Sequence, residues 1–285
     1  MSATVAAGRR RAAGVLAETR KLSAFMRRDV FVMLSYRVAF LSDLVFIGVQ
    51  AVVFSFLAKM VDPAQLPTYH GKVATYLEFV MIGVVISTVS SLLLQRVATA
   101  MRQEQMMGTL EALLTSPTSP ATTQVGSIAL DLLLIPARMG ALLVLVALTF
   151  GLDFQLDGVL PGAVVFAAFV PFVWGLGLVA AASTLTFRRG GGLAAAGMSG
   201  IALVSGAFFP LALLPGWIQA LAAVNPVAIA LEGIRESLIG GAGWAEVGPD
   251  VLLLIPLSAL AVAGGAVAFR AALAREHRHG TLGLY

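Results

Sequence analysis

The sequence predicts an all-α membrane protein with six transmembrane helices, and three observations lead to this fold class. Of the 285 residues, 59% are hydrophobic and only 12% are charged, and the mean hydropathy is +0.91. Several apolar segments exceed the roughly 20 residues that a helix needs to cross a bilayer. Basic residues gather in alternate connecting segments, as is typical of multi-pass membrane proteins. A soluble chain of this length would carry more charge.

The predicted spans divide the chain into three parts. The spans cover residues 38–61, 73–95, 126–150, 159–187, 192–210 and 250–273. Residues 38–273 therefore form the transmembrane domain, which residues 1–37 precede and a tail of residues 274–285 follows. We expect both end segments to lie in water or at the membrane surface.

The N-terminal segment predicts an amphipathic helix in the membrane interface. Charged residues between Glu18 and Asp29 interrupt any apolar core after Arg9, which argues against a secretory signal peptide. From Leu22 to Tyr36, apolar residues fall on one helix side and basic residues on the other. A disordered basic tail that follows the same charge bias is the alternative, and it is the expectation for residues 1–13.

The distribution of basic residues predicts the orientation. With the N-terminus in the cytoplasm, only Lys59, Lys72 and Arg235 fall outside, while Arg138 lies within a span. Both termini are then cytoplasmic. The acidic residues that face out are Asp153, Asp157, Glu246 and Asp250.

A charged segment, Arg102 to Pro117, lies between the second and third predicted spans, on the cytoplasmic side. Its composition predicts a helix in which Glu104, Gly108 and Glu111 share one face and apolar residues share another. Pro117 ends this helix. Such a face lets another protein approach closely between two carboxylates. The alternative is an amphipathic connector that rests on the membrane.

The chain has no nucleotide-binding P-loop, so it carries no energy source of this kind. Its lysines are Lys21, Lys59 and Lys72, and the Gly71-Lys72 pair is followed by Val73, without a glycine at position 66. Enzymatic chemistry is not indicated either. The chain has no cysteine, and its histidines His70, His277 and His279 lack the spacing of metal ligands.

The run E-x-x-x-G-T-L-E-x-L-L-x-S-P from Glu104 to Pro117 resembles the coupling-helix region of ABC-2 type permeases, the membrane subunits of ABC exporters. The six spans and the run from Pro210 to Arg235 are also similar to this family, in its daunorubicin-resistance, nodulation and polysaccharide-export group. The resemblance implies a second permease chain, most simply a homodimer, and a separate ATPase that binds Mg-ATP. It also implies a bacterial cytoplasmic membrane. The implied ATPase-docking residues are Arg102, Glu104, Gly108, Thr109, Leu110, Glu111 and Leu114.

Between the fifth and sixth spans the sequence predicts two short helices. Leu211 to Val224 is apolar but too short to span, and Asn225-Pro226 separates it from a helix with Glu232 and Arg235 facing the outer water. The resemblance implies that these are re-entrant helices that form an extracellular exit gate. A plain external helix stabilised by the Glu232–Arg235 pair is the alternative. The gate residues are Pro210, Pro215, Trp217, Asn225, Pro226, Glu232 and Arg235.

Small and polar residues on the second and fifth spans predict close helix packing. The resemblance also allows some of their hydroxyls, together with nearby large apolar residues, to line the transport pathway, namely Ser87, Ser91, Met198, Ser205, Phe208 and Phe209. Asp131 and Arg138 are ionisable groups deep in the third span. Their roles are open between satisfaction within the bundle, gating or protomer contact, and substrate contact.

These observations predict the permease subunit of an ABC-2 exporter for a hydrophobic, drug-like or lipid-linked substrate. Phe and Met outnumber Trp and Tyr, with 16 Phe and 10 Met against 3 Trp and 4 Tyr, which disfavours a sugar-stacking channel. The alternatives are an ABC-2 permease for polysaccharide or lipo-oligosaccharide and, in another class, an ATPase-independent secondary transporter or channel. A membrane scaffold would not explain the charged segment.

Overall fold

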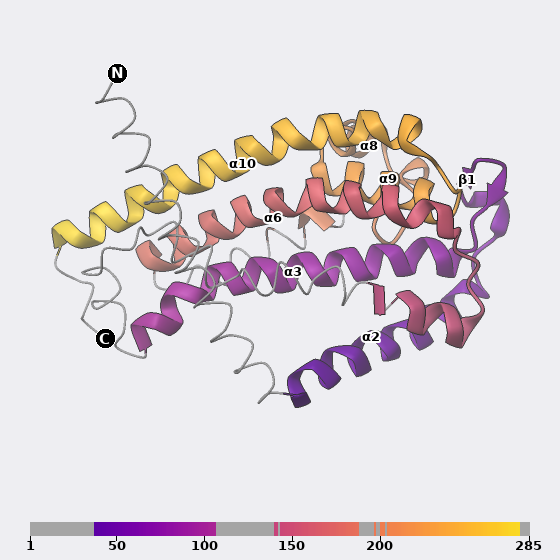
Figure 1. Cartoon of the computed structure of the whole chain (residues 1–285), viewed down its shortest axis with the longest axis horizontal. Coiled ribbons are helices and arrows are strands. Elements are labelled where there is room, and N and C mark those ends of the chain that lie inside the picture. Colours follow the sequence, from indigo (N-terminus) through magenta and orange to yellow (C-terminus); the bar gives the residue numbers. More distant parts are fainter. Residues whose placement is uncertain are drawn as a thin grey trace, which may run out of the picture.

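The computed structural model describes residues 37–106, 140–141, 143–187, 197, 200–202 and 204–279. Within these ranges, long helices run roughly side by side along one direction (Figure 1). They are α2 (Arg37–Ala58), α3 (Tyr76–Met106), α6 (Val159–Phe187) and α10 (Trp244–His279). Shorter elements are η1 (Pro63–Gln65), β1 (Thr68–Tyr69), β2 (Lys72–Val73), η2 (Leu156–Gly158), η3 (Leu211–Leu213), α8 (Gly216–Ala222) and α9 (Pro226–Leu238).

Several described helices are long and apolar enough to cross a membrane. The spans Tyr76–Ala98, Leu156–Thr184 and Trp244–Arg275 qualify, and α8 with α9 adds a fourth if this bent pair is one span. A multi-pass α-helical membrane domain is therefore confirmed. The predicted spans 126–150 and 192–210 lie partly outside the described residues, so the number of six stays a prediction.

Helix α3 is the central helix of the described bundle and contacts α2, α6 and α9. Of the most apolar stretch of α3, 78% is buried inside the bundle, against 17% of the corresponding stretch of α10. The helix runs past the predicted end at residue 95 to Met106. No Gly or Pro interrupts residues 95–106, and strong helix formers such as Ala, Met, Gln and Arg predominate there. Residues 102–106, the start of the Arg102–Pro117 segment, thus continue α3, and residues 107–117, which hold the rest of the predicted helix, lie outside the described residues.

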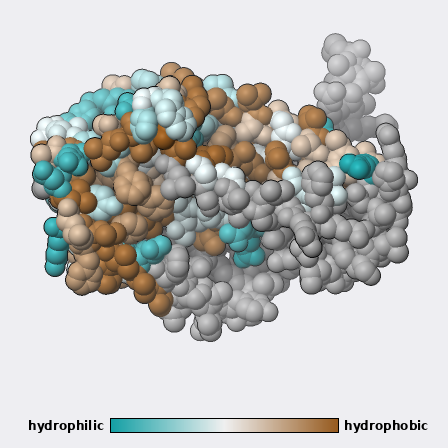
Figure 2. Space-filling view, turned by 180° about the vertical axis from the view of Figure 1, so that it is seen from behind, coloured by the Kyte–Doolittle hydropathy of each residue, from teal (hydrophilic) through white to brown (hydrophobic). Residues whose placement is uncertain are grey.

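Helices α6 and α10 pack together more extensively than any other pair in the described part of the chain. Glycines make this possible, because Gly175 and Gly265 bring the two backbones into direct contact. Helix α6 has the predicted bounds of 159–187, whereas α10 extends beyond 250–273 at both ends. The other side of α10 exposes large apolar residues, as suits a lipid-facing surface: Leu252, Leu253, Ile255, Leu260 and Val267. Seen from behind, much of the coloured surface of the bundle is hydrophobic, with hydrophilic patches between (Figure 2).

A β-hairpin marks one end of the bundle, which we call the hairpin end (Figure 1). Strands β1 and β2 pair antiparallel, with Thr68 opposite Val73 and Tyr69 opposite Lys72. His70 and Gly71 between them have positive φ values of 49° and 82°, as a two-residue hairpin turn requires. The prediction of an all-α chain did not include this hairpin.

Candidate functional site

The bent helix pair α8–α9 lies at the hairpin end, and its two axes differ by 82°. Local chemistry explains the bend. The Asn225 side chain accepts a hydrogen bond from the Val227 N–H at 3.0 Å and so caps α9, while Pro226 occupies the first turn. The predicted break at Asn225-Pro226 is therefore confirmed. Of the other predicted gate residues, Pro215 occupies the N-cap position of α8 without a side-chain hydrogen bond, Trp217 is exposed and Pro210 is buried.

Removing the cap of α9 tests this account of the bend. We expect Asn225→Ala to lower the free energy of unfolding by about 1 kcal/mol, because the first N–H groups of α9 lose their acceptor. Asn225→Asp keeps that acceptor and loses only the Nδ2 hydrogen bond to the Ile201 carbonyl at 3.3 Å. Thermal unfolding in detergent measures both variants. If both variants lose the same free energy of unfolding, the lost hydrogen bond to Ile201, and not the lost cap, causes the destabilisation.

One side of α9 is apolar and packs inward, as its sequence predicts. Val227, Leu231, Ile234 and Leu238 are all buried. The prediction that Arg235 faces the outer water is wrong, because Arg235 is only 2% exposed. Helix α9 contacts α3, α6 and α10, and the stripe that stays half-exposed holds Ile229, Glu232 and Glu236 instead of Arg235.

The buried Arg235 guanidinium binds backbone carbonyls. Its Nε and Nη2 donate to the Phe79 carbonyl of α3 at 3.3 and 3.1 Å. Nη2 also donates to the carbonyls of Gly206 and Ala207 at 3.0 and 3.1 Å. The guanidinium carbon lies 3.5 Å from the centroid of the Phe79 ring, a cation–π contact. The carboxylate of Glu232, one turn earlier on α9, is 3.8 Å away and half-buried.

Segment 206–209 lies directly against α3. A Cβ atom at Gly83 would come within 1.9 Å of the Ala207 carbonyl oxygen, so only glycine fits there. The Tyr76 hydroxyl donates to the Phe208 carbonyl at 3.3 Å. The Phe208 ring stacks on Phe54 of α2, with 6.2 Å between the ring centroids. Segment 206–209 therefore joins α2, α3 and α9.

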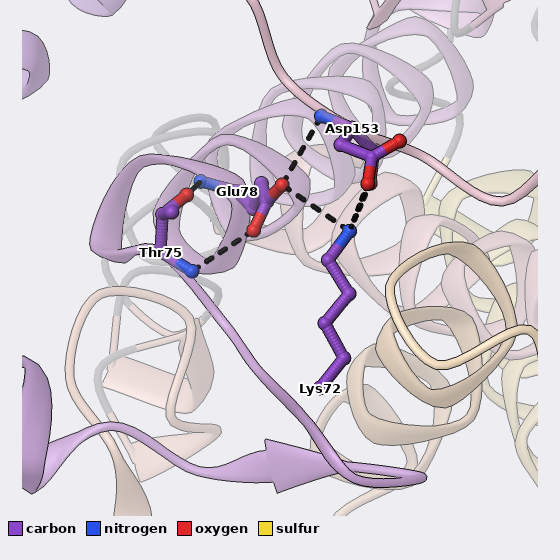
Figure 3. A network of polar contacts seen from close by, with 4 residues as sticks. All are labelled: Lys72, Thr75, Glu78 and Asp153. Atoms are coloured by element: carbon purple, nitrogen blue, oxygen red, sulfur yellow. Dashed lines mark hydrogen bonds and ion pairs between the residues drawn. The ribbon is translucent and has the colours of Figure 1, made fainter.

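A second polar cluster surrounds the buried Glu78 (Figure 3). Thr75 and Glu78 form a capping box at the start of α3, with hydrogen bonds of 2.9 and 3.2 Å between side chains and backbone N–H groups. The second oxygen of Glu78 accepts from the Asp153 N–H at 3.1 Å and lies 3.6 Å from Lys72 Nζ. Lys72 also binds Asp153. Glu78 thus joins the hairpin, α3 and the loop that leads into α6.

The hydroxyl of Tyr69 extends this polar region toward α9. It donates to the Glu232 carboxylate at 3.3 Å. Burial and the adjacent Glu232 charge raise the pKa of Tyr69 well above its usual range. Tyr69 therefore stays protonated and remains a hydrogen-bond donor.

The structure brings together only some of the predicted site residues. Of the proposed pathway residues, Ser205 is buried and donates to the Ala202 carbonyl, Phe208 is half-buried and Phe209 is 53% exposed. Ser87 and Ser91 lie on α3, and the Ser87 hydroxyl is buried without a hydrogen-bond partner among the described residues. Arg102 and Glu104 belong to the last turns of α3. The remaining candidates lie outside the described residues: Gly108, Thr109, Leu110, Glu111, Leu114, Asp131, Arg138 and Met198.

Of the residues at this site, Glu78 was not predicted from the sequence, and Arg235 was predicted as a gate residue but in the outer water instead of the core. The T-x-x-E pattern of Thr75 to Glu78 was a usable signal for Glu78, because it is the signature of a capping box. Arg235 had no such signal, since a Glu232–Arg235 pair at three-residue spacing also suits a solvent-exposed helix. In the described ranges, no group of three or more acidic or His side chains could hold a metal ion.

Comparison with known proteins assigns the chain to a family. The family model for ABC-2 type transporters matches residues 20–239, which is well over half of the chain. No curated protein matches the chain. The match includes α2, α3, α6 and the bent pair of α8 and α9. This membrane chain, which lacks a P-loop, belongs to the ABC-2 type transporter family, whose members are the permease components of ABC transporters.

Proposed function

We propose that this chain is the permease subunit of an ATP-driven exporter, working as a homodimer with a separate ATPase that binds Mg-ATP. The continuity of α3 is the observation that carries this proposal. One helix of 31 residues, about 46 Å long at the usual rise per residue, connects the hairpin end to residues 102–106. These residues begin the segment that resembles a coupling helix. Movement of a docked ATPase at this segment would therefore reach the opposite end of the bundle.

The proposed topology places the hairpin end outside the cell and both chain termini in the cytoplasm of a bacterium. Charge supports this orientation. Arg96 near the end of α3 and Arg270 and Arg275 near the end of α10 lie toward the opposite end of the bundle. Asp153 and Glu246 lie at the hairpin end. In this arrangement six helices span the membrane, and α8 and α9 form a re-entrant pair on the extracellular side.

In the proposed transport cycle, ATP-driven closure of the two ATPase subunits pushes the segment 102–117. The packed helices then shift between two arrangements as rigid bodies. The bent pair α8–α9 acts as the exit gate. This chain contributes the pathway and the gate, and the partner contributes ATP hydrolysis.

A hydrophobic, drug-like or lipid-linked molecule is the proposed substrate. The exposed rings and side chains near the gate include Phe209, Leu213, Trp217 and Leu221. Such a surface suits an apolar molecule that leaves through the outer leaflet. Export of polysaccharide or lipo-oligosaccharide is the second candidate, and comparing hydrophobic dyes with glycans as stimulators of ATP hydrolysis separates the two.

The docking segment provides the test of the proposed function. We expect Glu111→Lys and Gly108→Trp to abolish ATP-dependent export while membrane insertion and dimerisation persist, because reversed charge or added bulk disrupts the predicted docking face. Copurification of the ATPase and uptake by inverted vesicles measure binding and transport. Asp157→Lys is the control, since it makes the same kind of charge change at an exposed residue of η2, at the hairpin end.

Normal ATP-dependent export by Glu111→Lys would place the docking surface elsewhere. If no ATPase copurifies with the wild-type chain and transport continues without ATP, the chain is a secondary transporter or channel. Such a transporter needs buried ionisable groups for ion coupling.

A further inference from the structure

We propose that Arg235 is the positioning residue that ties the gate to α3, so that α9 and segment 206–209 move with α3 while α8 moves independently. The inference rests on the proposed function and deepens it, because it divides the bent pair into a fixed arm and a free arm. It assigns transmission between α3 and the gate to one buried side chain.

Arg235 carries a buried guanidinium. A charged group inside a membrane domain is unfavourable unless its donors are satisfied, and such groups are therefore few and tied to function. Arg235 meets this cost by binding the Phe79 carbonyl of α3 and the carbonyls of Gly206 and Ala207. Its flat face also lies on the Phe79 ring. One side chain of α9 thus holds two other parts of the chain.

The planar, forked guanidinium can donate in several directions while it stacks on a ring, whereas a lysine ammonium offers a point charge without a planar face. Lysine would keep the charge but lose the stacking and part of the hydrogen bonding. We call the stacked and hydrogen-bonded Arg235 side chain the clamp. If only the charge matters, Arg235→Lys should behave like the wild type; if the clamp matters, Arg235→Lys should weaken the attachment of α9 to α3.

Arg235 holds segment 206–209 against α3, and other contacts hold it there as well. Segment 206–209 contacts α3 at Gly83, and the Tyr76 hydroxyl binds the Phe208 carbonyl. Because Arg235 binds both α3 and this segment, neither can shift past the other without breaking several contacts. Helix α9, segment 206–209 and the outer half of α3 therefore form one rigid unit.

Helix α8 is not part of this unit. Its main contacts among the described elements are with the neighbouring η3, and Trp217 and Leu221 on it are exposed. The 82° bend between α8 and α9 then marks the boundary between the fixed and free arms. The gate opens by movement of α8 about residues 223–225.

Spin-label distances in the full-length chain test the clamp without transport. The chain has no cysteine, so Val73→Cys and Phe209→Cys, both at exposed positions, create a unique label pair. In lipid nanodiscs, with the labelled chain diluted in an excess of unlabelled chain so that only distances within one protomer are measured, we expect one narrow distance for this pair. Arg235→Met should broaden the distribution, Arg235→Lys should broaden it less, and Tyr76→Phe should have the smallest effect. Arg275→Met is the matched control, because Arg275 is exposed near the end of α10.

A transport measurement separates positioning from simple folding. In the reconstituted complex with the ATPase, we expect Arg235→Met to lower export by about tenfold while ATP turnover stays within about twofold. Parallel loss of folded yield, ATP turnover and export would make Arg235 merely structural. An unchanged narrow distance in both Arg235 variants would also overturn the proposal. If the distance broadens but no ATPase binds the wild-type chain, the clamp stands and the proposed function fails.

Discussion

Gly265→Leu is expected to force α6 and α10 apart and to remove most of the folded protein. A Cβ atom at Gly265 would lie 2.4 Å from the Gly175 carbonyl oxygen and 3.0 Å from the Leu178 Cβ. Overpacking a core costs about 1–3 kcal/mol where side chains can shift. Here the obstacle is backbone, which cannot turn aside, so the loss should reach or exceed the upper end of that range.

The adjacent glycine provides the control for this experiment. Gly264 lies on the same helix, but a Cβ atom there would meet no atom within 4 Å. Gly264→Leu should therefore leave folding unchanged. Fluorescence-detected size exclusion and thermal unfolding compare the two variants. Equal behaviour of Gly264→Leu and Gly265→Leu would show that α6 and α10 do not cross at this point.

The second large effect is expected from Glu78→Leu. This substitution removes the acceptor of the Thr75 and Asp153 N–H groups and leaves Lys72 without its buried partner. Breaking a buried pair typically costs about 3–5 kcal/mol. Because Lys72 is 28% exposed and can reach water, we expect a loss of about 3 kcal/mol in the free energy of unfolding.

Two further variants separate the contribution of the buried Glu78 from that of the exposed Asp153. Asp153→Asn changes a carboxylate that is 77% exposed, so it should cost at most about 1 kcal/mol. Glu78→Gln keeps one acceptor oxygen without the charge and should fall between the two. Thermal unfolding measures the series. If Glu78→Leu and Asp153→Asn are equally stable, Glu78 does not join the hairpin, α3 and the α6 loop as described.

Helix bounds show how far local composition predicts this fold. The predicted range 159–187 equals the observed α6, because apolar residues fill this stretch, Pro161 lies in the first turn where proline is tolerated, and Pro171 does not break the helix. Helix α3 is longer than predicted because helix-forming residues continue beyond its apolar stretch. Hydropathy falls after residue 95, but the residues up to Met106 remain good helix formers. Apolar length thus predicts where a helix crosses the membrane and does not predict where it ends.

The candidate gate was predictable in outline only. Asn225 and Pro226 predict a helix start, because Asn is a favoured N-cap residue and Pro suits the first turn, and α9 begins there. Arg235 was assigned to the wrong environment, because its burial depends on Phe79 and Gly206, which are distant in the sequence. Likewise, nothing near Gly83 indicates that the backbone of Ala207 lies against it.

The sequence by itself determined the membrane class, most of the described helices, the break at Asn225-Pro226 and the absence of a P-loop. These properties depend on composition and on neighbours within a few residues. Only the tertiary structure decided that Arg235 is buried, that Glu78 joins three elements and that Gly265 permits a backbone contact. Each of these depends on which distant segment packs against the residue, and hydropathy and helical periodicity carry no information about that partner.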